Sequence, residues 1–227
     1  MKIAVIPARG GSKRIPRKNI KTFNGRPMIA WSINAALESA CFDRVVVSTD
    51  DDDIAAIAKE CGAEVPFMRP ASLSDDYCGT SEVVAHAIEW FSGQQTGIQF
   101  ACCIYATAPF IRADDLRQSL ACIEESTADY CFSVTSYAFP IQRAIRVTEA
   151  KRCEMFTPEM FDERSQDLEA AYHDAGQFYW GRPEAWNEIR PIFSENAIPF
   201  IIPRHRVQDI DTPEDWERAE LMIQALL

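Results

Sequence analysis

The stretch IAVIPARGGSKRIPRKNIK, Ile3 to Lys21, joins a short apolar run to a dense cluster of positive charge. Ile3 to Ile6 is apolar throughout and ends at a proline followed closely by two glycines, which is typical of a buried strand that leads into a loop. Pro7 to Lys21 then carries six basic residues and no acidic residue in fifteen positions. The sequence therefore predicts a buried strand followed by a cationic loop.

The cationic loop has the composition of an anion-binding site. Gly10 and Gly11 lack a Cβ atom, so backbone N–H groups can close around an anion between basic side chains. The loop matches neither G-x-x-x-x-G-K-[ST] nor G-x-G-x-x-G, so it indicates neither a P-loop NTPase nor a dinucleotide-binding protein. A solvated basic turn is the alternative, but like charges at this density repel one another unless an anion neutralises them. We therefore expect a polyphosphate ligand.

The rest of the chain is strongly acidic. The formal net charge is -11, and the sequence outside Pro7 to Lys21 contains 17 basic and 34 acidic residues. Because long-range attraction follows the summed field, the backbone of a nucleic acid is expected to be a poor partner. The cationic loop is too small for a duplex but suits a triphosphate.

Length and composition indicate one globular domain over residues 1–227, because 227 residues with 47% apolar content can bury a full core. No run approaches the roughly 20 apolar residues of a membrane span, and the N-terminal apolar run is too short for a secretory signal. The eight cysteines form no C-x-x-C pair, and Cys102 and Cys103 lie in an apolar run. We expect the cysteines to be reduced core residues, and we expect a cytoplasmic protein that does not bind membranes.

Apolar runs alternate with segments of helical periodicity along most of the chain. This alternation predicts an α/β fold, with a mostly parallel sheet and helices on both faces. Ligands of such sheets bind at the carboxyl ends of the strands, where both the cationic loop and the segment YATAPF are placed. Strands are expected near 3–6, 44–49, 64–67, 100–106, 130–137, 171–181 and 198–203. Helices are expected from Pro27, from within the run Ser48 to Asp53, from about Ala113 and from Pro213, and Thr80 or Ser81 is expected to cap a further helix.

Residues 139–170 interrupt this alternation. The segment has mixed charge and no clear hydrophobic period. An irregular stretch of this length is uncommon in a compact domain unless it has a function. We expect an inserted lid or dimerisation arm here.

The segment QDIDTPED carries two acids, Asp209 and Asp211, before a predicted helix. Residues two apart on an extended segment point to the same side, and one or two carboxylates with phosphate oxygens suit Mg²⁺. The alternative is that Asp211 only precedes the helix, which Thr212 caps with Asp215 in a capping box. Beside a triphosphate loop, the metal interpretation is the better one.

Two further polar groups have structural interpretations. The run STDDDD, Ser48 to Asp53, coincides with a helix start, where acids favour the helix dipole, and Asp50 is the one expected to face the cleft. His173 and Asp174 are adjacent on a predicted strand, so they point to opposite faces and are not expected to form a hydrogen-bonded dyad. Either of them could reach a ligand.

Three segments resemble one protein family. PARGGSKRIPRKNIK, VVSTDDDDIAAIAKECGAEVPFMRPASLSDD and QDIDTPEDW are similar to the cytidylyltransferases that activate nonulosonic acids, the CMP-sialic acid synthetase family. The resemblance covers nearly the whole chain outside residues 139–170. It implies a nucleotide-diphospho-sugar transferase fold, a homodimer formed through the insertion, and Mg²⁺ as cofactor.

The resemblance also implies roles for individual residues. The cationic loop would hold the phosphates and ribose of CTP, a second group would border the cytosine, and two acids would bind the metal. The first group comprises Arg9, Gly10, Gly11, Lys13, Lys18 and Asn19, the second Arg69, Thr80 and Ser81, and the third Asp209 and Asp211, with Lys18 and Asp211 expected to act in catalysis.

The expected sugar pocket departs from that of the sialic acid enzymes. Tyr105 of YATAP stands where they carry a glutamine that touches the sugar, and His173 of HDAG replaces an arginine that binds the sugar carboxylate. The segments YATAPF, FPIQRAI and YHDAGQFYWG resemble the branch that activates pseudaminic acid, a diamino sugar of inverted ring stereochemistry. Arg143 or Arg146 would then bind the carboxylate. The expected sugar contacts are Tyr105, Arg143, His173, Asp174, Gln177 and Tyr179.

The resemblance thus implies transfer of CMP from CTP to the C2 hydroxyl of a nine-carbon acidic sugar, with release of pyrophosphate. N-acetylneuraminic or legionaminic acid as the substrate and a non-catalytic nucleotide-sensing module are the alternatives. A glycosyltransferase is disfavoured, because a triphosphate requires more positive charge than a nucleotide sugar does. The catalytic base stays open among Asp211 acting through a water, Asp174 and His173.

Overall fold

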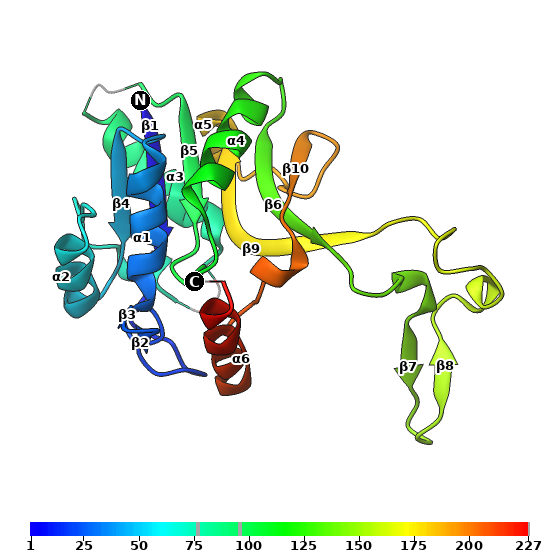
Figure 1. Ribbon diagram of the computed structural model, residues 1–227. Helices are drawn as coiled ribbons and strands as arrows, with labels where there is room; N and C mark the ends of the chain where they lie inside the picture. The colour runs from blue at the N-terminus through cyan, green and yellow to red at the C-terminus, as the bar shows by residue number, and fades with distance from the viewer. Residues whose placement is uncertain (76–77, 95–96, 227) are drawn as a thin grey trace.

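The apolar run at the N-terminus forms β1 (Lys2–Pro7), in which Ile3 to Ile6 are fully buried. The computed structural model describes residues 1–75, 78–94 and 97–226, and β1 lies inside a six-stranded sheet of order β10-β6-β9-β5-β1-β4 (Figure 1). Only β9 runs antiparallel to its neighbours in this sheet, so the expected mostly parallel α/β fold is confirmed. The other strands are β4 (Arg44–Ser48), β5 (Phe100–Ile104), β6 (Tyr130–Ser136), β9 (Tyr172–Gly181) and β10 (Ala197–Ile201).

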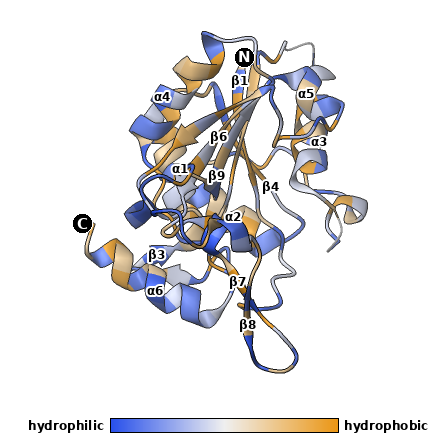
Figure 2. Ribbon diagram, turned by 90° about the vertical axis from the view of Figure 1, so that its right-hand side faces the viewer, coloured by the Kyte–Doolittle hydropathy of each residue, from blue (hydrophilic) through white to orange (hydrophobic). Residues whose placement is uncertain are grey.

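Helices cover both faces of the sheet (Figure 2). Successive side chains of a strand point to opposite faces, so β1 contributes to an apolar cluster on each side. Ala4 and Ile6 pack into one apolar cluster, while Ile3 and Val5 pack into the other. The first cluster contains α1 (Met28–Ser39), α2 (Asp52–Glu60) and α4 (Ala113–Glu124), and the second contains α3 (Thr80–Ser92) and α5 (Pro183–Asn187).

The last helix, α6 (Pro213–Gln224), begins as the sequence predicts. The Thr212 side chain accepts from the Asp215 backbone N–H, and the Asp215 carboxylate accepts from Thr212 in a complete capping box. Trp216 then packs edge-on against Phe23 with ring centroids 5.4 Å apart. This packing holds α6 beside the ribbon of β2 (Thr22–Phe23) and β3 (Arg26–Pro27), close to the cationic loop.

Two local predictions are wrong. Residues 64–67 do not form a strand, and the chain makes only isolated bridges there, from Val46 to Glu64 and from Thr49 to Met68. The cap of α3 is Gly79 in an extended conformation, not Thr80 or Ser81, which lie in the first turn.

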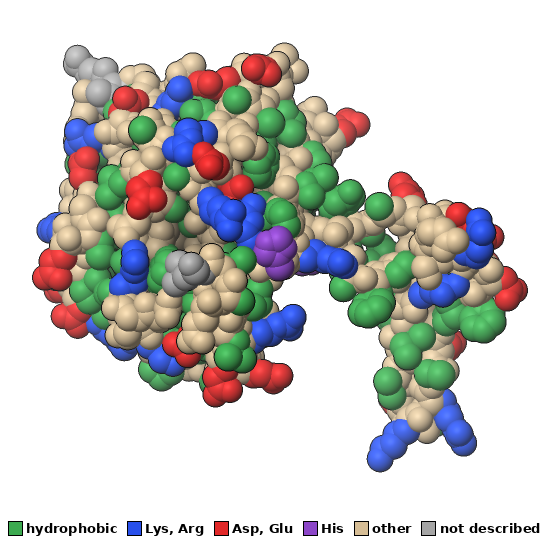
Figure 3. All heavy atoms as spheres, in the orientation of Figure 1, with side chains coloured by type: hydrophobic (Ala, Val, Ile, Leu, Met, Phe, Trp, Pro, Cys, Tyr) green, Lys and Arg blue, Asp and Glu red, His purple; other side chains and the backbone are tan. Residues whose placement is uncertain are grey.

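The segment 139–170 leaves the sheet after β6 and extends away from it as an arm (Figure 1). Hydrophobic side chains gather on this arm (Figure 3), and Phe139 is 83% and Val147 75% exposed. Cys153, also on the arm, is exposed, and Cys41, Cys61, Cys78 and Cys122 are half-buried, so the expectation of core cysteines holds for Cys102, Cys103 and Cys131. The arm contains η2 (Ile141–Arg143), β7 (Ile145–Val147), β8 (Cys153–Met155) and η3 (Pro158–Met160).

All eight cysteines are free thiols, as expected. Within the described ranges, no helix is both long and apolar enough to cross a membrane.

A buried ion pair fixes the segment that leads to Asp209. Arg206, in the short helix η4 (Arg204–Arg206), donates to both carboxylate oxygens of Asp115 at 2.6 and 3.1 Å. The Arg206 carbonyl in turn accepts from Gln177 Nε2 at 2.6 Å. Both members of the ion pair are buried, so their hydrogen bonds must be nearly complete for the fold to tolerate them.

Asp115→Ala is expected to lower the free energy of unfolding by about 3 kcal/mol, because it leaves the buried Arg206 guanidinium without its partner. Asp114→Ala is the matched control, since the Asp114 side chain is 71% exposed and pairs with Arg117 at the surface. It should cost less than about 1 kcal/mol. Urea unfolding of both variants measures the difference, and equal losses would contradict this role of Asp115.

Candidate active site

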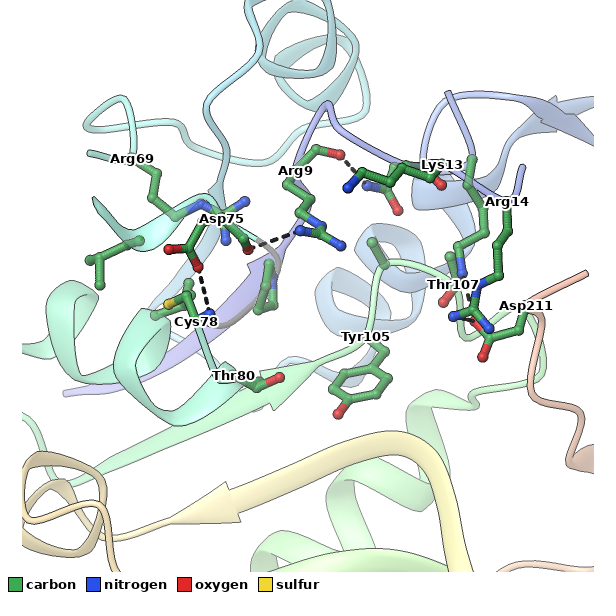
Figure 4. A pocket seen from close by; sticks show the side chains of 17 residues that line it. Arg9, Lys13, Arg14, Arg69, Asp75, Cys78, Thr80, Tyr105, Thr107 and Asp211 are labelled. Atoms are coloured by element: carbon green, nitrogen blue, oxygen red, sulfur yellow. Dashed lines mark hydrogen bonds and ion pairs between the residues drawn. The ribbon is translucent and has the colours of Figure 1, made fainter. Parts of the chain in front are cut away.

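A cavity of about 640 Å³ opens at the carboxyl ends of β1 and β5 (Figure 4). This is the edge at which ligands of parallel sheets bind, and it is where the sequence placed the cationic loop. Segments far apart in the chain meet here, from the loop after β1 to Asp211, two residues before α6. The polar lining residues are Arg9, Ser12, Lys13, Arg14, Lys18, Asn19, Arg69, Asp75, Cys78, Thr80, Tyr105, Thr107 and Asp211.

Four of the six basic residues of the cationic loop line the cavity. The other two are held elsewhere. Arg17 lies 2.6 Å from Asp51 and 2.7 Å from Asp53, at the start of α2, and Lys21 lies 4.3 Å from the centre of the Trp216 ring. The four cations that remain at the cavity are Arg9, Lys13, Arg14 and Lys18.

Arg17 also explains the acidic run before α2. Asp51 caps α2 by accepting from Ile54 N–H, which confirms the expected capping role of this run. Burial tends to raise the pKa of Asp51, but the hydrogen bonds from Ile54 and Arg17 outweigh it and lower the pKa. Asp50, expected to face the cleft, instead accepts from Gly10 N–H and lies 3.9 Å from Arg69.

The sequence predicts that the N–H groups of Gly10 and Gly11 close around an anion, and the structure gives the first of them another partner. Gly10 N–H donates to the Asp50 carboxylate at 2.9 Å, and Gly11 is exposed. A Cβ atom on Gly10 would lie 2.6 Å from an Asp51 oxygen, so the missing side chain allows the loop to pack on the start of α2. Neither glycine lines the cavity, and neither does Ser81, whereas Ser12 does. The part of the cationic loop that lines the cavity is therefore made of side chains and not of glycine backbone.

Asp211 faces the cationic loop directly. Lys18 Nζ donates to the Ile210 carbonyl at 2.6 Å and lies 3.4 Å from an Asp211 oxygen, and Arg14 lies 2.9 Å from the same oxygen. Asp209 does not line the cavity. Partial loss of hydration raises the pKa of Asp209, the charge of Asp211 raises it further, and Lys18 opposes both effects. The two carboxylates are therefore close enough to repel each other.

This pair of acids fits Mg²⁺. Mg²⁺ is usually held by one or two carboxylates while substrate phosphates supply further oxygens. No group of three or more His, Cys, Asp or Glu residues that could hold a metal occurs among the residues described, so the protein alone offers no closed metal cage. Burial is the main cause of the raised pKa of Asp209, and a divalent cation would relieve the repulsion from Asp211 that adds to it.

Arg69 is the most buried charge at the cavity. Its side chain is 4% exposed, its ion pair with Asp50 is 3.9 Å long, and its Nε and Nη2 atoms have no hydrogen-bond partner within the described part of the chain. Burial lowers its pKa, and Asp50 raises it in opposition. Buried donors without acceptors are rare, so this guanidinium is suited to the carbonyl oxygen of a ligand.

The predicted sugar contacts are mostly not at the cavity surface. Tyr105 lines the cavity, but Arg143, His173, Asp174, Gln177 and Tyr179 do not. Arg143 donates to Ser165 and to backbone carbonyls within the arm, and Arg146 pairs with Glu154 there. Gln177 is buried against Arg206, as described above. The sequence could not show that Arg143 and Gln177 lie outside the cavity lining, because the tertiary fold alone places the arm and the C-terminal segment.

His173 and Asp174 form no side-chain dyad, as expected for neighbours on a strand. The His173 ring stacks edge-on with Tyr137, and its Nδ1 atom lies 2.8 Å from the backbone carbonyl of Asp174. The Asp174 carboxylate instead accepts from Gly176 N–H and from the Tyr179 hydroxyl.

Ser12, Asp75 and Thr107 line the cavity without having been predicted as site residues. Asp75 could not be found from a charge pattern, because its backbone carbonyl, not its carboxylate, accepts from Arg9 Nη1 at 2.9 Å. Thr107 belongs to YATAPF, whose position after a predicted strand was the available signal.

The sheet and a cavity in which four cations face a carboxylate are typical of enzymes that handle nucleoside triphosphates. The chain belongs to the cytidylyltransferase family, whose family model, named Cytidylyltransferase, matches residues 3–198.

Relatives with similar sequences are known. A pseudaminic acid cytidylyltransferase of Campylobacter jejuni subsp. jejuni is 45% identical over 97% of this chain and 95% of its own length. A CMP-N,N'-diacetyllegionaminic acid synthase of Legionella pneumophila subsp. pneumophila is 33% identical over 98% and 96%. The solved structure of a CMP:2-keto-3-deoxy-manno-octonic acid synthetase complexed with CTP superposes with a TM-score of 0.72 at 17% identity, covering 100% of this chain and 99% of that one. It confirms the expected fold.

Proposed function

We propose that this chain transfers CMP from CTP to a nonulosonic acid and releases pyrophosphate, and that the acceptor is pseudaminic acid. The observation that carries the proposal is the meeting of the cationic loop and Asp211 in one cavity, with Lys18 3.4 Å and Arg14 2.9 Å from the same carboxylate oxygen. The 45% identity to a pseudaminic acid cytidylyltransferase over nearly the full chain supports this acceptor.

The reaction requires placement and charge neutralisation more than covalent catalysis. The C2 hydroxyl of the sugar attacks the α-phosphorus of CTP in line with the departing pyrophosphate. Arg9, Lys13 and Lys18 neutralise the negative charge that develops on the phosphate oxygens. Arg69 donates to a carbonyl oxygen or ring nitrogen of the cytosine, which satisfies its buried N–H groups.

Asp209 and Asp211 would hold Mg²⁺ beside the phosphates, and the ion would supply further positive charge there. Even without the ion, Asp211 orients Lys18 and Arg14, because both contact its carboxylate. Orientation of this kind contributes to the rate because it is present before the substrates arrive.

The acceptor is tested with a panel of purified sugars. Pyrophosphate release from CTP is measured with pseudaminic, legionaminic and N-acetylneuraminic acid, with a reaction lacking sugar as the control. We expect kcat/KM for pseudaminic acid to exceed the other values by about tenfold or more. A preference for legionaminic acid, for which the relative from Legionella pneumophila is named, would change the acceptor. Binding of CTP without pyrophosphate release would indicate a nucleotide-sensing module.

Asp211→Asn is expected to lower kcat about 10³-fold, because it removes the negative charge that holds both the metal and the two cations. The midpoint for activation by added Mg²⁺ should rise as well. Glu214→Gln, an exposed position in the first turn of α6, is the matched control and should leave kcat unchanged. Near-normal turnover of the Asp211 variant at low Mg²⁺ would refute the metal assignment.

We also propose that the chain forms a homodimer through the arm. Large hydrophobic side chains are rarely exposed together on a monomer, and Phe139, Val147, Phe156 and Phe161 are all exposed here. Val147→Asp should shift the mass in solution from dimer to monomer, as measured by light scattering. Leu221→Asp changes an equally prominent leucine of α6, 69% exposed, and should leave the dimer intact. A wild type of monomer mass would contradict the proposal.

A further inference from the structure

Gln177 is a buried polar residue of β9 that the proposed function does not use, and it is 3% exposed. Its backbone carbonyl accepts from the Tyr105 N–H at 2.9 Å, and its side-chain Nε2 donates to the Arg206 carbonyl at 2.6 Å. Tyr105 lines the cavity, and Arg206 precedes Asp209 by three residues. Gln177 therefore joins two parts of the site that lie far apart in the sequence.

The backbone of Tyr105 is held from both sides. Its N–H is bonded to Gln177, and its carbonyl accepts from the Ser32 hydroxyl of α1 at 2.7 Å. Ser32 and Gln177 are both buried, so these bonds lie in a medium where they are strong. Tyr105 directly follows β5, and the next two residues, Ala106 and Thr107, line the cavity as well. The fixed backbone of Tyr105 therefore determines where this wall of the cavity begins.

The Arg206 end of the link is also fixed. The Arg206 guanidinium is bonded to Asp115 in the first turn of α4, and its carbonyl is the acceptor for Gln177. The chain from Tyr105 to Asp115 connects the two ends of the link. These four residues therefore close a ring of hydrogen bonds and covalent backbone, which ties the position of Arg206 to that of Tyr105.

A bulge in β9 allows Gln177 to make the link. The pairing with β6 shifts register so that two steps along β6 span five along β9, and Gln177 lies inside this bulge, after Gly176 with φ of +62°. A regular strand would point Gln177 to the same face as Tyr179, which packs in the second cluster. Its side chain instead reaches η4, beside which Ile202 and Val207 pack in the first cluster. Bulges re-aim side chains in this way beside functional sites.

The amide of Gln177 is not explained by packing. Its Oε1 atom is buried and has no hydrogen-bond partner within the described part of the chain. A buried acceptor without a partner costs stability, and a methionine would fill a similar volume without that cost. The side chain is therefore explained by the bond that its Nε2 atom makes to Arg206.

We propose that Gln177 is a positioning residue that fixes the separation between Tyr105 and the segment carrying Asp209 and Asp211. Under the proposed function, on which this inference rests, Tyr105 faces the acceptor sugar and the two aspartates face the phosphates. The attacking oxygen and the α-phosphorus must approach in line, and small misplacements slow such reactions strongly. Gln177 contacts neither substrate and acts through Tyr105 and Arg206.

Hydrogen exchange of the metal-free protein tests the link directly. Gln177→Met removes the donor to Arg206 at nearly unchanged volume. The backbone N–H groups of residues 204–211 should then exchange about tenfold faster, because the segment is released from β9. Exchange at the wild-type rate would overturn the proposal.

Thr135→Val is the matched control. Thr135 is buried, and its hydroxyl donates to the Ile202 carbonyl at 2.7 Å, four residues before Arg206. The variant removes a bond to the same stretch of chain but leaves the link to Tyr105 intact. Its exchange over residues 204–211 should match that of the wild type, and an equal acceleration in both variants would reduce Gln177 to a general structural role.

Kinetics then separate positioning from binding. Gln177→Met should lower kcat for CMP transfer and raise the Mg²⁺ concentration for half-maximal activity, each about tenfold, as the loss of a residue that supports metal ligands does. Binding of CTP without Mg²⁺ should change less than about threefold, because Arg9, Lys13 and Arg69 are not attached to the link. A normal kcat with a normal Mg²⁺ requirement contradicts the positioning role.

If Gln177→Met melts at a lower temperature than Thr135→Val, Gln177→Glu separates the hydrogen bond from the packing. A carboxyl group of the same size donates to the Arg206 carbonyl only when it is protonated. Exchange over residues 204–211 in this variant, relative to the wild type at the same pH, should therefore slow as the pH falls. A ratio that does not change with pH would rule out the donor role of Gln177.

The exchange measurement requires neither sugar nor metal, so the two proposals fail separately. If the wild type transfers CMP while Gln177→Met exchanges like the wild type, the positioning role is wrong and the proposed function stands. A wild type that transfers CMP to none of the sugars would overturn the proposed function and this role of Gln177 with it.

Discussion

Repulsion among the basic residues of the cationic loop is the constraint around which the site is arranged. Six positive charges in fifteen residues require partners, and the fold supplies them from distant segments. The start of α2 holds Arg17, the aromatic ring of Trp216 receives Lys21, and Asp211 faces Arg14 and Lys18. These partners also determine where each basic side chain points. They turn Arg17 and Lys21 away from the cavity and orient Arg14 and Lys18 toward it.

The same contacts bring the two ends of the chain together. Lys18 reaches the backbone and the carboxylate just before α6, and the capping box and the Trp216 contact fix where α6 begins. On the other side, the buried pair of Asp115 and Arg206 anchors the residues that precede Asp209. The proposed metal ligands therefore lie on a short segment that is restrained at both ends.

Strand β9 contributes differently. It is the antiparallel strand of the sheet and the one whose pairing with β6 shifts register. A regular strand in this place would direct Asp174 away from Tyr179, whereas the bulge brings both behind the cavity wall.

Local patterns alone determined the α/β alternation, the buried strand β1, the caps of α2 and α6, and the concentration of positive charge beside the sheet, because each depends on residues within a few positions of one another. Tertiary packing decided the rest. It assigned the Gly10 N–H to Asp50, left Arg69 buried without full partners among the described residues, buried Gln177 against Arg206, and placed Arg143 on the arm. Those outcomes depend on which distant groups compete for the same hydrogen bonds, and no spacing within the chain encodes that competition.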